Sequence, residues 1–332
     1  MTFGALGGIK EHGRNCFYIQ GKNTSFLLDC GEGEKGEMPD FDFIPPERVD
    51  YLYLSHSHLD HTGAIKEFYS RGFRGILLCS EDTYSLLKDK PSKVKFLIPN
   101  QETILKNGIR LFPRRSGHCF GSLSLLLTME EKNILYTGDY LEDGIFQVDE
   151  IRNEKADLAI IDGCYSQERP IQENRKRLLD FIRKTEGDII LPLPRNGRSM
   201  EIIHLLNKES IPYLIHKPGF YIGDESVYLK EEVEIRHAKK ARIHLMDDPQ
   251  LEKEESRSLI SSRKDAALIF TGTIDEGSYA QKLLKERDKT FFYRINVHQT
   301  IQQAENLIQE NDFKKTVLFH NKELSQEKKI SF

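Results

Sequence analysis

The sequence predicts an α/β protein in which strands dominate the first half and a mostly parallel sheet with flanking helices forms the second. Apolar runs of strand length alternate with Gly-containing turns through the first half of the 332 residues. After residue 169, helix-like and strand-like segments alternate, as they do around a parallel sheet. The length suits one large or two modest domains.

The expected elements follow in order along the chain. Strands are expected at residues 15–21, 25–33, 49–58, 74–80, 109–115, 122–129, 133–139, 189–194, 212–216, 267–272, 290–298 and 315–321. A helix is expected at 171–187 because Leu178, Leu179 and Ile182 share one helical face and Gly187 can end it. Further helices are expected at 197–207, 278–288 and 300–308. The Glu- and Lys-rich stretch 230–263 is expected to be a solvated helix or loop.

Composition excludes several classes of protein. A formal net charge of −4 argues against a protein that coats nucleic acid by bulk charge. The five cysteines are scattered and form no CxxC pair, so neither a disulfide framework nor a thiolate zinc site is indicated. No apolar stretch approaches the ~20 residues of a membrane helix, and no secretory signal is recognisable at the start. We therefore expect a cytoplasmic protein without membrane contact.

The strongest local signal is the segment SHSHLDHTG, residues 55–63, directly after an expected strand. His56 and His58 are two residues apart and can turn their imidazoles toward one centre. Asp60 and His61 continue the turn and can face a second centre. The segment is therefore typical of a site for two adjacent metal ions rather than of a polar loop.

This HxHxDH pattern resembles the signature of the metallo-β-lactamase superfamily. The resemblance implies two further ligands, His118 in SGHCFGS and Asp139 in ILYTGDY, each after an expected strand. Asp29 in FLLDCG resembles the early aspartate that supports the ligand loop in that superfamily.

The later segments resemble the β-CASP nuclease branch, which includes RNase J, the cleavage and polyadenylation endonuclease and Artemis-like repair enzymes. LAIIDGCYS provides Asp162, INVHQTIQQ provides His298, and KTVLFHN provides His320 as a final metal ligand. Gln299 and Thr300 stand where the branch usually carries a following aspartate, which makes the role of His298 less secure. The resemblance implies a metallo-β-lactamase αββα sandwich with a reduced β-CASP-like α/β cap inserted before the C-terminal segment. The expected boundaries are 1–165 and 290–332 for the core and 166–289 for the cap.

The mechanism implied by the resemblance uses two Zn²⁺ per chain, with Mn²⁺ as the alternative. One ion is expected at His56, His58 and His118, the second at Asp60, His61 and His320, and Asp139 is expected to bridge them. A metal-bridging hydroxide would attack the phosphodiester, and His298 held by Asp162 would protonate the leaving oxygen, so Asp60, His298 and Asp162 are the expected catalytic residues. Expected substrate contacts are Ser116, Arg195, Arg198, Gly277 and Ser278.

The substrate is expected to be single-stranded RNA or DNA. His320 resembles the RNA-processing members, whereas SGHCFGS and YTGDY resemble the DNA-repair members, and RNA is slightly favoured. The alternatives are a small-molecule metallo-hydrolase of the lactonase or thioesterase type and a non-catalytic nucleic-acid-binding subunit. A homodimer is compatible with the sequence, which does not determine the oligomeric state.

Overall fold

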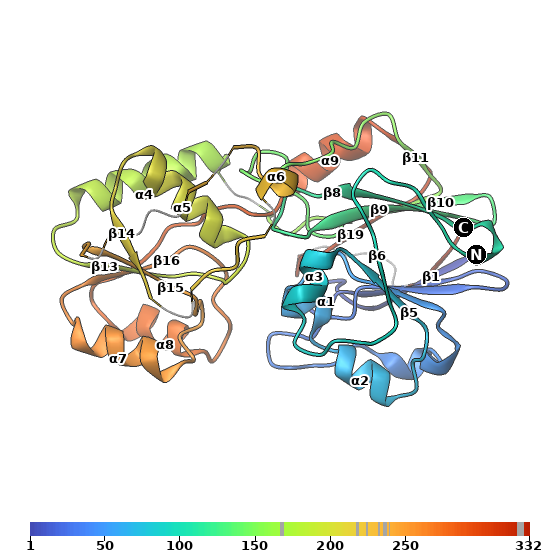
Figure 1. Cartoon of the computed structure of the whole chain (residues 1–332), viewed down its shortest axis with the longest axis horizontal. Helices are drawn as coiled ribbons and strands as arrows, with labels where there is room; N and C mark the ends of the chain where they lie inside the picture. Colours follow the sequence, from blue (N-terminus) through green and yellow to red (C-terminus); the bar gives the residue numbers. More distant parts are fainter. Residues whose placement is uncertain are drawn as a thin grey trace. The chain divides into compact units, whose positions relative to one another are not determined.

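The computed structural model describes residues 1–166, 169–216, 219–223, 225–231, 233–234, 238, 240–323 and 329–332 (Figure 1). The chain divides into two compact units. The first unit combines Met1–Glu142, Phe146–Glu168 and His298–Phe332, and the second combines Asp143–Ile145 and Arg169–Val297. That the second unit is a β-CASP-like cap stays a prediction. No helix within the described ranges combines the length and the apolarity that crossing a membrane requires.

The first unit contains two large sheets. In spatial order, the first sheet is formed by β20 (Lys329–Ser331), β1 (Thr2–Gly7), β2 (Cys16–Gln20), β3 (Ser25–Leu28), β4 (Tyr51–Tyr53), β5 (Ile76–Cys79) and β6 (Val94–Phe96). The second sheet is formed by β19 (Thr316–Phe319), β12 (Leu158–Asp162), β10 (Lys132–Tyr136), β9 (Leu123–Met129), β8 (Arg110–Arg115) and β7 (Thr103–Ile104). A two-stranded sheet pairs β11 (Lys155–Ala156) with β18 (Asp312–Phe313). The helices of this unit are α1 (Leu59–Thr62), α2 (Ile65–Ser70), α3 (Glu81–Leu86) and α9 (Ile301–Gln309).

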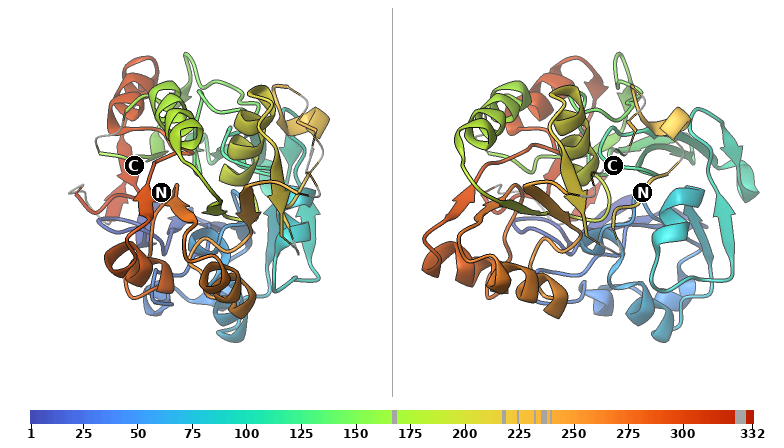
Figure 2. Two further views of the ribbon diagram at one scale, coloured as in Figure 1. Left: turned by 90° about the vertical axis from the view of Figure 1, so that its left-hand side faces the viewer. Right: turned by 60° about the vertical axis from the view of Figure 1, so that its left-hand side comes forward.

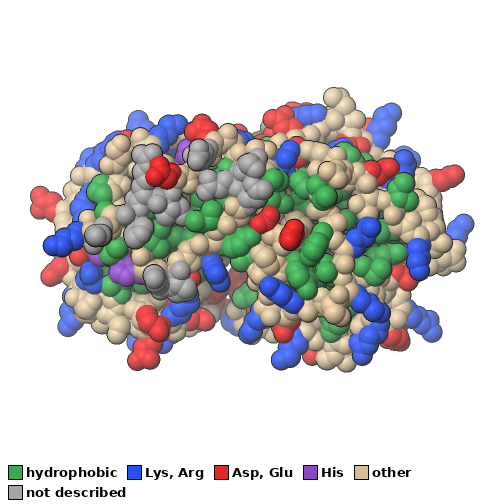
Figure 3. All heavy atoms as spheres, in the orientation of Figure 1, with side chains coloured by type: hydrophobic (Ala, Val, Ile, Leu, Met, Phe, Trp, Pro, Cys, Tyr) green, Lys and Arg blue, Asp and Glu red, His purple; other side chains and the backbone are tan. Residues whose placement is uncertain are grey.

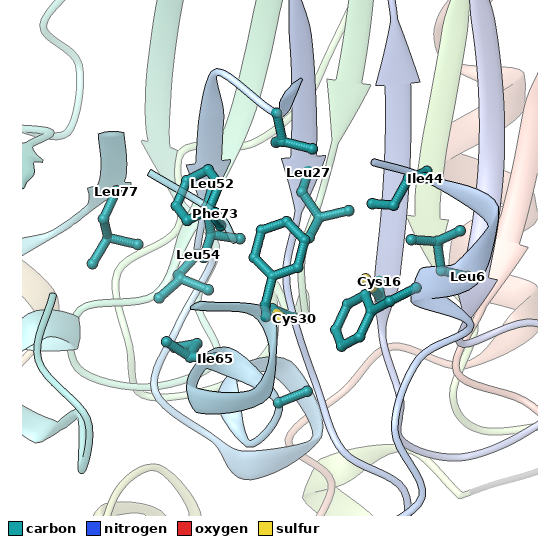
Figure 4. Close-up of a cluster of buried hydrophobic side chains, with 14 of the residues drawn as sticks. Leu6, Cys16, Leu27, Cys30, Ile44, Leu52, Leu54, Ile65, Phe73 and Leu77 are labelled. Carbon is teal, nitrogen blue, oxygen red and sulfur yellow. The ribbon is translucent and has the colours of Figure 1, made fainter. Parts of the chain in front are cut away.

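The two sheets pack face to face because successive side chains of a strand point to opposite faces. On the inner faces, the ring of Phe17 in β2 lies edge-on to Tyr136 at 5.7 Å and to Phe319 at 5.2 Å between ring centroids. On the outer face of the first sheet, Leu52 of β4 packs with Ile65 of α2 in the cluster of Figure 4.

The second large sheet is covered in the same way. Ala304 and Leu307 of α9 pack against Ala159 and Ile161 of β12 and Leu318 of β19. The first unit is therefore the predicted αββα sandwich, with helices packed on the outer face of each large sheet.

The second unit contains one five-stranded sheet in which every pairing is parallel. Its strands, in spatial order, are β14 (Tyr213–Ile215), β15 (Ile243–Met246), β13 (Ile189–Pro192), β16 (Ala267–Phe270) and β17 (Thr290–Phe292). Figures 1 and 2 show α4 (Ile171–Lys184) and α5 (Arg198–Lys208) on one face of this sheet, and α7 (Glu254–Ser262) and α8 (Tyr279–Glu286) on the other. The short helix α6 spans Glu225–Tyr228. The alternation of strands and helices in the sequence correctly predicted this parallel sheet.

The expectation for residues 230–263 was wrong in part. The segment Ile243–Met246 forms β15, which pairs with strands on both sides, and all four residues are buried. Four apolar or aromatic residues between charged flanks are too few to show a period, so this strand is identified only by its neighbours. The Gly-containing strand β1 was missed as well, because its position depends on pairing with β2 and β20.

Candidate metal centre

The HxHxDH segment links the end of β4 to the single turn of α1. His56 and His58 lie in the extended connection, and His58 is the residue that precedes the helix. Its carbonyl accepts hydrogen bonds from the backbone N–H of His61 (3.0 Å) and from Thr62 Oγ1 (3.0 Å). This turn directs Asp60 and His61 to the same buried region as the two preceding histidines.

The first predicted ligand set is brought together. His58 Nδ1 lies 3.1 Å from His56 Nε2 and 3.1 Å from His118 Nε2. Asp139 Oδ2 lies 3.3 Å from His56 Nε2 and 3.4 Å from His118 Nε2. Ligands about 2.0–2.1 Å from a tetrahedral zinc ion are about 3.3 Å from one another. The four distances are therefore close to those expected around a tetrahedral metal ion.

The second predicted set shares Asp139 with the first. Asp139 Oδ1 lies 3.1 Å from His61 Nε2 and 3.3 Å from His320 Nδ1. Asp60 Oδ2 lies 3.5 Å from His61 Nε2 and 3.2 Å from His320 Nε2. One oxygen of Asp139 thus faces each set, which is the arrangement of a bridging carboxylate.

Unsatisfied atoms show that these residues fit metal ions. Within the described part of the chain, both carboxylate oxygens of Asp139 and Nδ1 of His320 are buried and accept or donate no hydrogen bond. A buried carboxylate that accepts no hydrogen bond needs positive charge close by, and a coordinated cation would provide it. His320 also adopts a left-handed backbone conformation (φ 69°), held by the hydrogen bond from its N–H to Gly8 O (2.9 Å).

The electrostatics differ between the two ligand sets. In the second set, Asp139 and Asp60 outweigh burial, raising the pKa of His61 well above its ordinary value and that of His320 to about 10. A bound cation would therefore displace protons from these two rings.

In the first set, burial favours the neutral rings. Burial and the adjacent His56 lower the pKa of His58 to about 3. Burial also lowers the pKa of His118 well below its ordinary value. Burial alone would raise the pKa of Asp139, but the surrounding imidazoles, His61 foremost, outweigh it and lower that pKa well below its usual range. Neutral imidazoles and an ionised carboxylate are the forms that bind cations.

Asp29 supports the ligand loop from behind. It accepts hydrogen bonds from the N–H of Ser55 (2.7 Å), from Ser55 Oγ (2.7 Å) and from Tyr136 Oη (2.5 Å). Its Oδ2 also lies 2.6 Å from His61 Nδ1, which orients the opposite nitrogen of that ring toward Asp139. The supporting role that the resemblance implied for Asp29 agrees with these contacts.

Replacing Asp29 with asparagine should weaken binding of the ion at Asp60, His61 and His320 about 10- to 100-fold. The asparagine amide carries no negative charge and has one acceptor oxygen instead of two. It therefore holds the Nδ1–H of His61 less strongly, and the ring loses its fixed tautomer and orientation. Calorimetric titration of the metal-free protein with Mn²⁺ or Zn²⁺ measures this affinity. Asp42→Asn, at an exposed aspartate paired with Arg71, is the matched control. Equal affinities in the two variants would contradict the supporting role.

Asp162 and His298 lie together beside the metal ligands. His298 Nδ1 is 3.2 Å from Asp162 Oδ2 and 3.6 Å from Asp139 Oδ2. The ring of His298 packs edge-on against Tyr165 at 5.3 Å between ring centroids. The side chain of Gln299, the residue after His298, donates to the carbonyl of Asp162 (2.6 Å). This hydrogen bond ties the segment that carries His298 to the end of β12.

The predicted substrate contacts are divided between the units. Ser116, in the first unit, is buried, and its Oγ has no hydrogen-bond partner among the described residues. In the second unit, Arg198 Nε donates to Ile295 O (3.0 Å), and Ser278 Oγ accepts from Gln281 N (3.1 Å) as the N-cap of α8.

The other two predicted contacts also have structural partners in the second unit. The N–H of Gly277 donates to Gln281 Oε1 (3.1 Å), and the carbonyl of Arg195 accepts from the N–H of Tyr221 (2.8 Å). These hydrogen bonds give Arg195, Arg198, Gly277 and Ser278 structural roles within the second unit. A role in substrate binding stays a prediction for all five residues.

The sequence interpretation missed His12 and Asn15, both in the loop between β1 and β2. Asn15 Nδ2 lies 2.9 Å from His61 Nε2. The ring of His12 lies edge-on to His320 at 5.5 Å between ring centroids, and burial together with His320 lowers the pKa of His12 to about 3. The Gly-rich composition of this loop was the one signal that could have drawn attention to it, because such loops allow close backbone approach.

Comparison with known proteins identifies the family of this chain. The model of the metallo-beta-lactamase superfamily matches residues 9–192, more than half of the chain. An RNase J-like protein of Methanocaldococcus jannaschii is 27% identical over 321 residues, which cover 84% of this chain and 73% of that protein. The endoribonuclease ysh1 of Schizosaccharomyces pombe is 28% identical and the match covers 63% of this chain and 32% of the relative. The cleavage and polyadenylation specificity factor subunit 3-I of Arabidopsis thaliana is 28% identical, with 65% of this chain and 37% of the relative covered.

These relatives confirm the predicted resemblance to RNase J and the cleavage and polyadenylation endonuclease. They also confirm the predicted enzyme class at the level of the family, that of metal-dependent hydrolases with nuclease members. The chain spans only about a third of the length of two of the three relatives. Its own activity and substrate are therefore matters for proposal.

Proposed function

Since this chain belongs to the metallo-beta-lactamase superfamily, we propose that it is a dinuclear metal-dependent nuclease that cleaves phosphodiester bonds and prefers RNA to DNA. The observation that carries the proposal is the pair of ligand sets joined by Asp139, together with the additional pair His298 and Asp162, which is grouped with Asp139 and His320. A small-molecule hydrolase of the same superfamily would have no need for that additional pair.

The ligand atoms assign a place to each ion. His56, His58 and His118 would hold one ion, Asp60, His61 and His320 the other, and Asp139 both. Two Zn²⁺ ions suit these nitrogen and oxygen ligands, and Mn²⁺ is the alternative. Two such ions would supply a nucleophilic water at neutral pH and offset the charge that the phosphate gains in the transition state.

The residues outside the ligand sets supply the proton for the leaving group. Asp162 Oδ2 holds the Nδ1 side of His298, which leaves Nε2 to carry a proton to the departing oxygen. Two backbone amides, those of Tyr140 and Cys164, donate to the Asp162 carboxylate at 3.1 Å each and hold it in place. The imidazole is thus oriented before substrate arrives.

The preference for RNA rests on the relatives. They are named as an RNase J-like protein and endoribonucleases, and the segments that carry His56 to His61, His118 and Asp139 lie within the residues 9–192 that match the family. On the face drawn in Figure 3, Lys and Arg side chains are interspersed with acidic ones, which agrees with the low net charge. Recognition is therefore expected to depend on the metal centre and local contacts more than on bulk charge.

Incubation with end-labelled single-stranded RNA and single-stranded DNA of the same sequence tests the proposal. Metal-quantified protein should cleave RNA faster than DNA, a chelator should stop cleavage, and Asp60→Ala should abolish it because one ion loses its carboxylate ligand. Asp42→Ala, at an exposed aspartate of the same unit, should cleave like the unchanged protein. Absence of cleavage by protein that carries about two ions would contradict the nuclease and favour a small-molecule hydrolase.

A further inference from the structure

We propose that His12, Cys164 and His320 form an outer site for a soft metal ion, which shares His320 with the inner dinuclear centre. The inference rests on the proposed metal centre, because His320 is assigned there as a ligand. One potential ligand atom from each of the three residues lies within 4.8 Å of the other two. Neither His12 nor Cys164 belongs to the inner ligand sets.

Three separate segments are held in place to form this cluster. The loop of His12 is tied to the inner centre at both ends, by His320 N–H to Gly8 O (2.9 Å) and by Asn15 N–H to Asp60 O (3.0 Å). Within the loop, the N–H of Gly8 donates to Glu11 Oε1 (3.0 Å), so the loop is closed on itself as well. These hydrogen bonds fix the backbone from which His12 projects.

The backbone of Cys164 is also held by hydrogen bonds. Its N–H donates to Asp162 Oδ1 (3.1 Å), and its carbonyl accepts from Asn321 Nδ2 (3.2 Å). Asn321 directly follows His320, so its side chain ties the backbone of Cys164 to the segment that carries His320. His12 is half-buried whereas Cys164 and His320 are buried, which gives the cluster an open side at His12.

The ligand chemistry of the outer cluster differs from that of the inner sets. A thiolate with two imidazoles favours soft or borderline ions such as Cd²⁺, Zn²⁺ and Cu⁺. The inner second set contains two carboxylates, Asp60 and Asp139, which suit Mn²⁺ better. Binding at the outer site releases the thiol proton of Cys164 to solvent, and no oxidation or reduction is involved.

Shared use of His320 couples the two sites. Both of its nitrogens face inner carboxylates, Nδ1 toward Asp139 (3.3 Å) and Nε2 toward Asp60 (3.2 Å). An ion in the outer cluster would draw this ring away from the inner second ion. Soft metal ions in excess should therefore compete with Mn²⁺, and Mn²⁺ itself should not occupy the outer site.

Titration of the metal-free protein with Cd²⁺ tests the inference, followed both by calorimetry and by the ultraviolet charge-transfer band of Cd²⁺–thiolate bonds. The histidines and aspartates of the inner centre cannot give this band. We expect the band in the unchanged protein, its loss in Cys164→Ser, and at least tenfold weaker binding in His12→Gln. Cys79→Ser, in the apolar core of the first sheet, should keep the band.

Circular dichroism establishes that each variant is folded, so a lost band is not a lost fold. Cd²⁺ binding by calorimetry without the band, or a band that persists in Cys164→Ser, would overturn the outer site while leaving the inner centre intact. A protein that binds no metal at all would instead contradict the proposed function. Excess Cd²⁺ should inhibit Mn²⁺-supported cleavage, and Cys164→Ser should raise the inhibiting concentration at least tenfold. Equal inhibition of the two proteins would also overturn the proposal.

Discussion

Asp139→Asn is expected to slow RNA cleavage by at least about a thousandfold, equivalent to about 4 kcal/mol of transition-state stabilisation. The two oxygens of Asp139 face different ligand sets, at 3.3 Å from His56 Nε2 and 3.1 Å from His61 Nε2. An asparagine of the same shape has one oxygen and no charge, so it cannot neutralise two ions at once. The change therefore removes the bridge while the volume of the side chain is preserved.

Metal content separates this explanation from unfolding. The Asp139→Asn protein should bind the second ion more than about 100-fold more weakly, a larger loss than that expected for residues that only support a ligand. Its circular dichroism spectrum should match that of the unchanged protein. A variant that binds two ions with unchanged affinity and cleaves at the original rate would contradict the bridging role of Asp139.

His298→Ala is expected to slow cleavage about 100- to 10,000-fold without loss of metal ions, because it removes the group assigned to protonate the leaving oxygen. The imidazole contacts Asp162 at 3.2 Å and is assigned neither to the set of His56, His58 and His118 nor to that of Asp60, His61 and His320.

Two comparisons make this prediction specific. A substrate with an activated leaving group needs little protonation and should be cleaved almost equally by His298→Ala and the unchanged protein. His204→Ala, at a half-buried histidine of α5, should have no effect on either substrate. Full activity of His298→Ala on ordinary RNA would favour the small-molecule hydrolase, which does not require this residue.

Local sequence patterns were sufficient to predict those features whose contacts join residues close together in the chain. The HxHxDH segment places four ligands within six residues, and one helical turn after β4 brings them together. The helix expected at 171–187 forms as α4, and Leu178, Leu179 and Ile182 are all buried, because a period of 3.6 residues is visible in any amphipathic helix. His118, Asp139, Asp162, His298 and His320 came from a family resemblance rather than from any local pattern.

Contacts between segments far apart in the sequence could be identified only from the tertiary structure. Asp162 and Phe319 are paired across β12 and β19, and this register places Asp162 and His320 at neighbouring strand ends although about half the chain separates them. The loop of His12 reaches His320 only because β1 and β2 bring it to the same edge. The strand β15 likewise becomes recognisable only between its two partners.

By itself, the sequence determined the alternation of elements, the ligand-bearing turn and the absence of a bulk basic charge. The tertiary structure decided which oxygen of Asp139 faces which ligand set, that Asp29 orients His61, and that His12 and Cys164 lie beside His320. The physical reason is that periodicity and spacing report on neighbours within a few residues. The distance between two side chains on different strands is set by sheet register and by packing, which depend on the whole chain.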